Sequence, residues 1–114
     1  MVDSISSPIG TSSWDILQSY TIAWDALYFS EGALVRLELW SNANTVKVLD
    51  IANNVSANQE SYLWTVPYYI PTGSNYSILI GEGTGVLDDG WGDDAFAHVY
   101  SDLFQINGCK YNRY

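Results

Sequence analysis

The densest group of reactive side chains in the sequence is a run of four aspartates, Asp88, Asp89, Asp93 and Asp94, arranged around Trp91. Carboxylate oxygens on a loop that contains glycine are suitable ligands for Ca²⁺, so this acidic run is a candidate calcium site. Its spacing does not match the EF-hand loop, which needs Asp-x-Asp-x-Asp-Gly followed by a Glu. The alternative is a solvated acidic loop, which is the commoner role of a charge run. No other cofactor is expected.

Side chains for covalent or acid–base catalysis are scarce. His98 is the single histidine, and no nucleophile motif surrounds it, so we expect it on the surface or in a loop. Cys109 is the single cysteine; it is a free thiol or forms a bridge between subunits, and with His98 it is too little for a zinc site. The glycines at 81, 83 and 85 lack the Lys of a phosphate loop. We therefore expect no enzyme activity.

Aromatic side chains are the stronger candidates for binding. Trp40 lies among charged residues on its predicted strand, Trp91 lies between two glycines, and Tyr68 and Tyr69 follow Pro67. Exposed aromatics of this kind either anchor a protein partner or, beside Asp and Asn, stack on a sugar ring. Protein contact is favoured because the sequence shows no row of aromatics. Four other aromatics lie at positions typical of a core, namely Trp14, Trp24, Tyr62 and Trp64.

The C-terminal residues 107–114 contain Lys110, Tyr111, Arg113 and Tyr114, and so hold half of the four basic residues. They form either a frayed tail or an arm that reaches a neighbouring subunit. Such an arm would complement the acidic run of another copy, and a head-to-tail contact of this type builds an open filament. The predicted partner is therefore another copy of the chain or a surface protein, with a glycan as the alternative.

Two N-glycosylation triplets occur, Asn54-Val55-Ser56 and Asn75-Tyr76-Ser77. In a secreted eukaryotic protein both asparagines would be acceptors on exposed segments. Asn54 is predicted in a turn and Asn75 at the start of a strand, so Asn54 is the better candidate of the two.

Composition narrows the class of protein. The chain has 114 residues, which is enough for one domain, with 47% hydrophobic, 15% aromatic and only 15% charged residues. The formal net charge of −9 disfavours nucleic acid and anionic membranes as partners. No apolar run approaches the roughly 20 residues that span a membrane, and the N-terminus has no signal-peptide pattern. Few charges and many aromatics favour a β-rich extracellular or surface protein.

Short runs of β-branched and aromatic residues, separated by turn residues, predict strands over residues 3–9, 20–25, 34–40, 45–51, 61–66, 76–80 and 102–106. In the third run Val35, Leu37 and Leu39 alternate with Arg36 and Glu38, which predicts a half-buried strand. Residues 41–44 read as a turn, and residues 82–100 as one long connection. The pattern predicts an antiparallel β-sandwich of about seven strands without helices.

The order of landmarks along these strands also has a family resemblance. The chain carries Ile, Pro, Gly and Trp, then Ile-x-Trp, Val-x-Leu-x-Leu, Ile-Ala, Ser-Tyr-x-Trp-x-Val-Pro, Tyr-x-Ile-x-Ile and Ser-Asp-x-Phe-x-Ile. These positions are Ile5, Pro8, Gly10, Trp14, Ile22, Trp24, Val35, Leu37, Leu39, Ile51, Ala52, Ser61, Tyr62, Trp64, Val66, Pro67, Tyr76, Ile78, Ile80, Ser101, Asp102, Phe104 and Ile106.

The pattern resembles the Ig-like, fibronectin type III-like domain of the Ser/Thr-rich glycolipid-anchored surface proteins, which is also the N-terminal part of the fungal cell-wall β-glucan assembly proteins. The resemblance implies one Ig-like β-sandwich over residues 1–106, followed by the tail or arm. It also implies, in a general way, a structural or assembly role at the cell surface. We therefore expect a non-catalytic extracellular or cell-surface module that acts through protein contacts, for example as a subunit of an extracellular fibre. A carbohydrate-binding cell-wall module that uses exposed Trp, Tyr and Asp is the alternative function.

Overall fold

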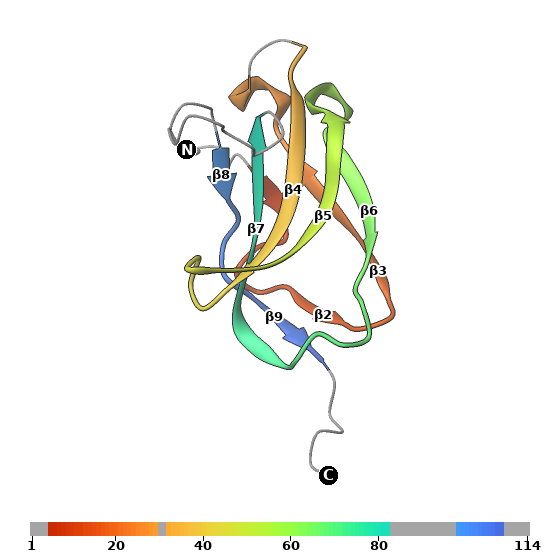
Figure 1. Ribbon diagram of the computed structural model, residues 1–114, viewed down its shortest axis with the longest axis vertical. Coiled ribbons are helices and arrows are strands. Elements are labelled where there is room, and N and C mark those ends of the chain that lie inside the picture. Colours follow the sequence, from red (N-terminus) through yellow and green to blue (C-terminus); the bar gives the residue numbers. More distant parts are fainter. Residues whose placement is uncertain (1–4, 30–31, 83–97, 109–114) are drawn as a thin grey trace.

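Two β-sheets face each other across a hydrophobic core in the computed structural model, which describes residues 5–29, 32–82 and 98–108 (Figure 1). The strands among these residues are β1 (Ile5–Ser7), β2 (Ser13–Asp15), β3 (Ser19–Trp24), β4 (Leu34–Ser41), β5 (Val46–Ser56), β6 (Ser61–Thr65), β7 (Gly73–Glu82), β8 (His98–Tyr100) and β9 (Phe104–Asn107). One sheet has the order β1-β3-β6. The other has the order β2-β9-β7-β4-β5, with β8 also paired to β7. The predicted Ig-like sandwich is confirmed.

Helical structure in the described residues is limited to two 3₁₀ turns, η1 (Ala26–Tyr28) and η2 (Ala57–Gln59). The side chain of Asp25 caps η1 by accepting a hydrogen bond from the N–H of Leu27 at 2.9 Å. Both turns lie at the same end of the molecule (Figure 1).

The N-terminal segment crosses from one sheet to the other. β1 pairs antiparallel with β3, whereas β2 pairs parallel with β9. Between them the backbone N–H of Gly10 donates to the carboxylate of Asp102 at 3.2 Å. The sequence predicted only the first of these strands, because three residues around one buried tryptophan, Trp14, are too short to show alternation.

The core is formed by the inward-facing residues of both sheets. Trp14 is central to its aromatic part: its ring stacks on Tyr20 at 4.8 Å and contacts Phe104 at 4.9 Å between centroids. Trp14, Trp24 and Trp64 are buried, as predicted, and Tyr62 is half-buried against the same core. Many of the fully buried aliphatic residues alternate along their strands, among them Ile22, Val35, Leu37, Leu39, Ile78, Ile80 and Ile106.

Several boundaries differ from the sequence prediction. β5 continues to Ser56, so Asn54 lies in a strand and not in a turn. Val35 pairs with Val55 and Leu37 pairs with Ala52, so β5 has one extra residue between these pairs and forms a β-bulge. Asn54 lies at this bulge with a positive φ of 58°, a conformation that Asn tolerates. β8 lies within the segment predicted as one long connection, and it places His98 in a strand and not in a loop.

Tyr76 fixes the connection between the two sheets at the start of β7. Its hydroxyl donates to the carbonyl oxygen of Pro71 at 2.6 Å, the arrangement known in Ig-like folds as a tyrosine corner. Gly73 makes room for the ring, because a Cβ at Gly73 would lie 3.0 Å from Cε2 of Tyr76. Burial raises the pKa of the Tyr76 hydroxyl above its ordinary value.

Replacing Tyr76 with Phe is expected to lower the free energy of unfolding by about 1 kcal/mol at pH 7, because the carbonyl of Pro71 loses its donor. In the wild type, the raised pKa means that the unfolded state ionises first. This contribution is therefore present below the ordinary tyrosine pKa and is lost as the pH rises through the folded-state value. Urea unfolding at pH 8 and at alkaline pH measures both effects. Tyr68→Phe, at an exposed position, is the control, and equal stability of Tyr76→Phe and wild type would contradict the assignment.

Candidate functional site

All of the charged residues predicted to act in binding, and several of the uncharged ones, fall outside the described residues. These residues are Asp88, Asp89, Asp93, Asp94, Lys110 and Arg113, together with Trp91, Tyr111, Tyr114 and Cys109. The calcium site and the C-terminal arm therefore stay predictions. In residues 5–29, 32–82 and 98–108, no group of three or more His, Cys, Asp and Glu side chains is placed to hold a metal ion. The described candidates are Trp40, Tyr68, Tyr69, Asn54 and Asn75.

The structure brings Tyr68 and Tyr69 together as an exposed aromatic pair between β6 and β7. Their ring centroids are 5.5 Å apart with an interplanar angle of 87°, and 66% and 56% of their surfaces are exposed. The adjacent Ile70 is fully buried and anchors the segment to the core. The two tyrosine rings are therefore exposed to solvent on a segment that the buried side chain of Ile70 holds against the core.

The turn between β2 and β3 is hydrogen-bonded to the segment just before the tyrosine pair. The backbone N–H of Leu17 donates to the carbonyl of Val66 at 2.7 Å, and the N–H of Val66 donates to the carbonyl of Gln18 at 3.0 Å. Leu17, at the turn between β2 and β3, is 63% exposed. We call Leu17, Tyr68 and Tyr69 the tyrosine surface. Periodicity could not reveal that Leu17 belongs to it, because the two connections are far apart in the sequence and are joined by these backbone hydrogen bonds.

The end of β9 and Gly108 lie beside the connection between β6 and β7. The side-chain amide of Asn107 donates to Ser13 Oγ at 3.0 Å and to Asp15 Oδ1 at 2.9 Å, so it ties the end of β9 to β2. Gly108 follows against the backbone of residues 70–72: a Cβ there would lie 1.9 Å from the carbonyl oxygen of Ile70. The backbone N–H of Gly108 donates to Thr72 Oγ1 at 2.8 Å. Gly108 therefore lies against the segment that directly follows Tyr68 and Tyr69.

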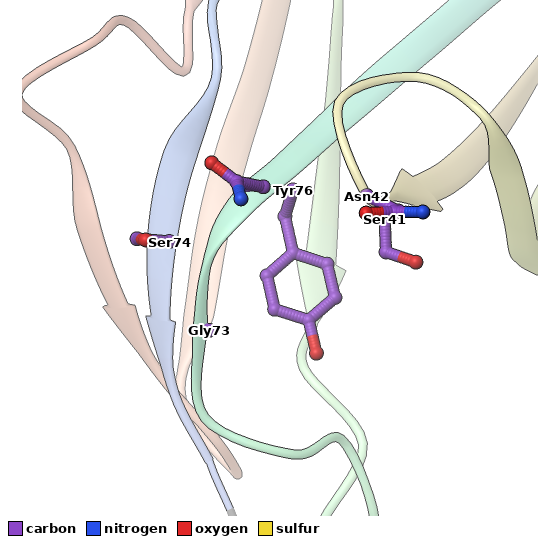
Figure 2. A pocket seen from close by; sticks show the side chains of 6 residues that line it. Ser41, Asn42, Gly73, Ser74 and Tyr76 are labelled. Atoms are coloured by element: carbon purple, nitrogen blue, oxygen red, sulfur yellow. The ribbon is translucent and has the colours of Figure 1, made fainter.

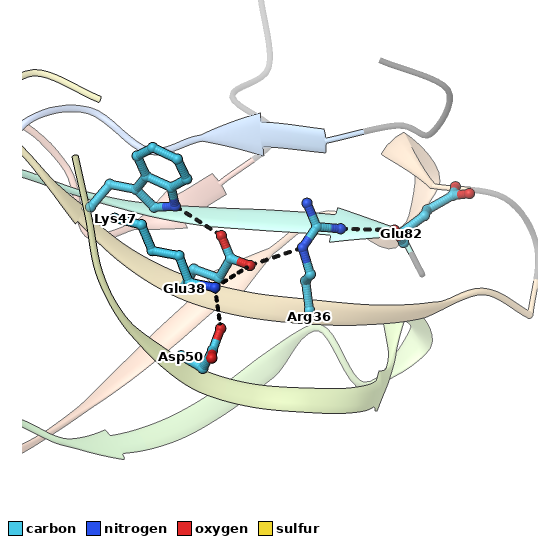
Figure 3. A network of polar contacts seen from close by, with 6 residues as sticks. Arg36, Glu38, Lys47, Asp50 and Glu82 are labelled. Atoms are coloured by element: carbon cyan, nitrogen blue, oxygen red, sulfur yellow. Dashed lines mark hydrogen bonds and ion pairs between the residues drawn. The ribbon is translucent and has the colours of Figure 1, made fainter. Parts of the chain in front are cut away.

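Trp40 is hydrogen-bonded to Glu38, which belongs to an ionic network on the outer face of the larger sheet (Figure 3). Arg36 Nε lies 3.0 Å from Glu38 Oε2, and Trp40 Nε1 donates to Glu38 Oε1 at 2.9 Å. Lys47 Nζ lies 3.4 Å from Glu38 and 2.6 Å from Asp50. The hydrogen bond to Asp50 raises the pKa of Lys47, and the charge of Glu38 adds to this effect. The indole N–H of Trp40 is thus already used within the protein.

This network changes the interpretation of β4. Arg36 is only 1% exposed and Glu38 only 6%, so the strand is buried on both faces and not half-buried as predicted. Arg36 also donates to the carbonyl of Glu82 at 3.0 Å, and its guanidinium lies over Gly81, where a Cβ would come within 2.8 Å of it. The Trp40 ring meets Tyr100 of β8 edge-on at 5.8 Å. The sequence could not predict this contact between Trp40 and Tyr100, because it depends on the pairing of β8 with β7.

A small polar hollow lies between the turn that follows β4 and the start of β7 (Figure 2). Its volume is about 220 Å³, and its lining residues are Ser41, Asn42, Gly73, Ser74, Asn75 and Tyr76. None of them is charged. The sequence predicted the turn at residues 41–44 and identified Asn75 as an acceptor for a sugar. It could not predict that the turn and Asn75 lie side by side, because this depends on the register of β4 against β7.

Backbone and side-chain bonds hold the turn beside β7. Asn42, Ala43 and Asn44 all have positive φ, at 56°, 56° and 69°. The N–H of Ala43 donates to the carbonyl of Asn75 at 3.2 Å, and the hydroxyl of Ser77 pairs with the side-chain oxygen of Asn44. The hollow therefore has one wall from the clamped turn and another from β7.

Removing the carboxylate of Glu38 is expected to be costly. Glu38→Gln removes the carboxylate that lies 3.0 Å from the buried guanidinium of Arg36, and we expect a loss of about 3–5 kcal/mol in the free energy of unfolding. Asp50→Asn is the matched control, because this carboxylate is 57% exposed and its loss should cost less than about 1 kcal/mol. Urea unfolding measures both. Equal losses would contradict a buried ion pair, and the double variant Arg36→Met, Glu38→Leu should recover stability.

Comparison with known proteins agrees with the fold and with the order of landmarks in the sequence. The family model described as the Kre9/KNH-like N-terminal Ig-like domain matches residues 7–106. No curated protein and no solved structure gives a match. This family is one of structural modules rather than of enzymes, and it is related to cell-wall assembly. No helix in the described part of the chain is long and apolar enough to cross a membrane. With almost its whole length matched, the chain belongs to the family of Kre9/KNH-like N-terminal Ig-like domains.

Proposed function

We propose that this chain is a non-catalytic module of the cell surface with a structural or assembly role, exerted through protein–protein contacts at the tyrosine surface. The cell-wall assembly family supports the location and the general role. The observation that carries the proposal is the exposed, mutually packed pair of Tyr68 and Tyr69 on an anchored segment.

Two properties make this pair suitable for a protein contact. Tyrosine supplies a large contact area with one hydroxyl for a hydrogen bond, and it is enriched among the residues that dominate binding energy at interfaces. The anchoring of Ile70 and Val66 means that little conformational freedom is lost when a partner binds. Leu17, whose backbone is hydrogen-bonded to Val66, adds an exposed apolar side chain on the neighbouring connection. Other copies of the chain are the first partners to test.

The alternative is carbohydrate binding through Trp40, Trp91 and nearby aspartates. Trp40 is less suited to this role than the tyrosines, because its N–H is donated to Glu38 and its ring is packed edge-on against Tyr100. A stacking platform needs a free ring face and polar neighbours that still have hydrogen bonds to offer. Protein contact is therefore the favoured function.

Changing both tyrosines tests the proposal. In the double variant Tyr68→Ala, Tyr69→Ala, we expect self-association to weaken at least tenfold, because two aromatic anchors of roughly 1–2 kcal/mol each are lost. Sedimentation velocity over a range of concentrations measures the association, and negative-stain microscopy shows whether fibres form.

Leu63→Ala is the matched control, since Leu63 is similarly exposed, at 67%, but lies on β6 and not on the tyrosine surface. It should leave association unchanged, and all variants should keep the unfolding midpoint within a few degrees of wild type. A wild-type protein that stays monomeric at every concentration and binds a glycan array would count against the assembly role and favour the alternative.

A further inference from the structure

We propose that Asn75 carries an N-linked glycan and that the polar hollow of Figure 2 holds its first sugar, an N-acetylated amino sugar, against the protein. This inference rests on the proposed function in one respect, since N-glycosylation requires the route to the cell surface. It does not depend on protein contacts at the tyrosine surface.

The chemistry of the hollow suits a neutral sugar. Its lining consists of hydroxyl, amide and glycine residues together with the Tyr76 ring, so it offers neither a charge to pair nor a large apolar wall. No hydrogen bond joins the side chains of Ser41, Asn42 and Ser74 to another residue in the described ranges, so their donors and acceptors can serve the hydroxyl and acetamido groups of a sugar. Pockets for drug-sized ligands have volumes of roughly 300–1,000 Å³. At about 220 Å³, this hollow has room for one sugar unit.

The attachment point is fixed relative to the hollow. Asn75 lines the hollow, its side chain is exposed, and its backbone carbonyl accepts the hydrogen bond from Ala43. A sugar on this side chain is thus joined to a rigid backbone at the rim of a cavity of matching polarity. A tether of this kind raises the effective concentration of the sugar at the hollow, so weak individual contacts are sufficient. Asn54 does not line the hollow and lies at a bulge of β5.

Burial of the third residue of the triplet sets the order of events. The hydroxyl of Ser77 is fully buried and paired with Asn44 in the folded chain, whereas Ser56 of the other triplet is exposed. Modification of Asn75 must therefore precede the pairing of β7 with β4. The donor is an oligosaccharide linked to a polyprenyl diphosphate. The side-chain nitrogen of Asn75 bonds to the anomeric carbon of the sugar, the bond from that carbon to the diphosphate oxygen breaks, and the amide proton passes to a base of the transferring enzyme while the lipid diphosphate leaves.

The test uses the full chain with Asn54→Gln, secreted from a eukaryotic host that adds N-glycans, so that Asn75 is the remaining triplet acceptor. Mass spectrometry should find Asn75 occupied. Peptide N-glycosidase should release this glycan at least tenfold more slowly from the folded protein than from the same protein unfolded in urea and kept from refolding. Ser74→Trp fills the hollow and leaves the triplet intact; we expect unchanged occupancy and release at least fivefold faster from the folded state.

Two results would overturn the proposal. One is an unoccupied Asn75, and the other is a release rate that is the same in Ser74→Trp as in the parent. Titration of the unglycosylated Asn75→Gln protein with free N-acetylglucosamine distinguishes the source of the sugar. We expect no saturable heat below millimolar concentration, because the tether is missing. Micromolar binding would instead make the hollow a receptor for a free sugar. Neither measurement requires self-association, so its outcome is separate from that of the tyrosine surface.

Discussion

The register of β7 against β4 is the constraint on which the other features depend. It places Arg36 opposite Gly81, the one residue type that leaves space for the guanidinium, and Trp40 opposite Ser77. A slip by one residue would turn Arg36 and Glu38 into the sandwich core and the core aliphatics outward. The same register brings the turn after β4 to the start of β7, so the polar hollow is a consequence of strand pairing.

β7 also pairs with the two strands that lie next to the candidate sites, β9 and β8. Its first half pairs with β9, which leads to Gly108 against the connection between β6 and β7, and its second half pairs with β8, whose Tyr100 packs edge-on against Trp40. Tyr76 stands at the start of the strand and fixes its entry into the sheet through Pro71. The candidate sites are therefore arranged around one strand, although their residues are far apart in the sequence.

The distribution of charge follows from the fold as well. The chain has four basic residues, and Arg36 and Lys47 are both paired with carboxylates of the network. Pairing of these two cations within the domain leaves little positive charge for an acidic partner. The tyrosine surface and the hollow, by contrast, are both built from uncharged side chains, which is consistent with neutral contacts rather than charge-driven ones.

Sequence patterns predicted the sandwich, seven of its strands and the three buried tryptophans, because alternation and turn residues are local signals. They missed β2 and β8, because each is only three residues long and is defined by its pairing with a distant strand, β9 or β7. Arg36 and Glu38 were expected on an exposed face for the same reason, since only β8 and Trp40 reveal that the face is covered. For the sites, the sequence identified Tyr68 and Tyr69, but neither Leu17 nor the walls of the hollow, which depend on contacts between distant segments.

The most direct test of the central claim, that this domain acts through its tyrosine surface, is amide NMR of the labelled protein over a series of concentrations. We expect concentration-dependent shifts confined to residues 16–18 and 67–72, with the outer face of β4 unchanged. An absence of shifts up to millimolar protein, or shifts centred on Trp40 and β8, would contradict it.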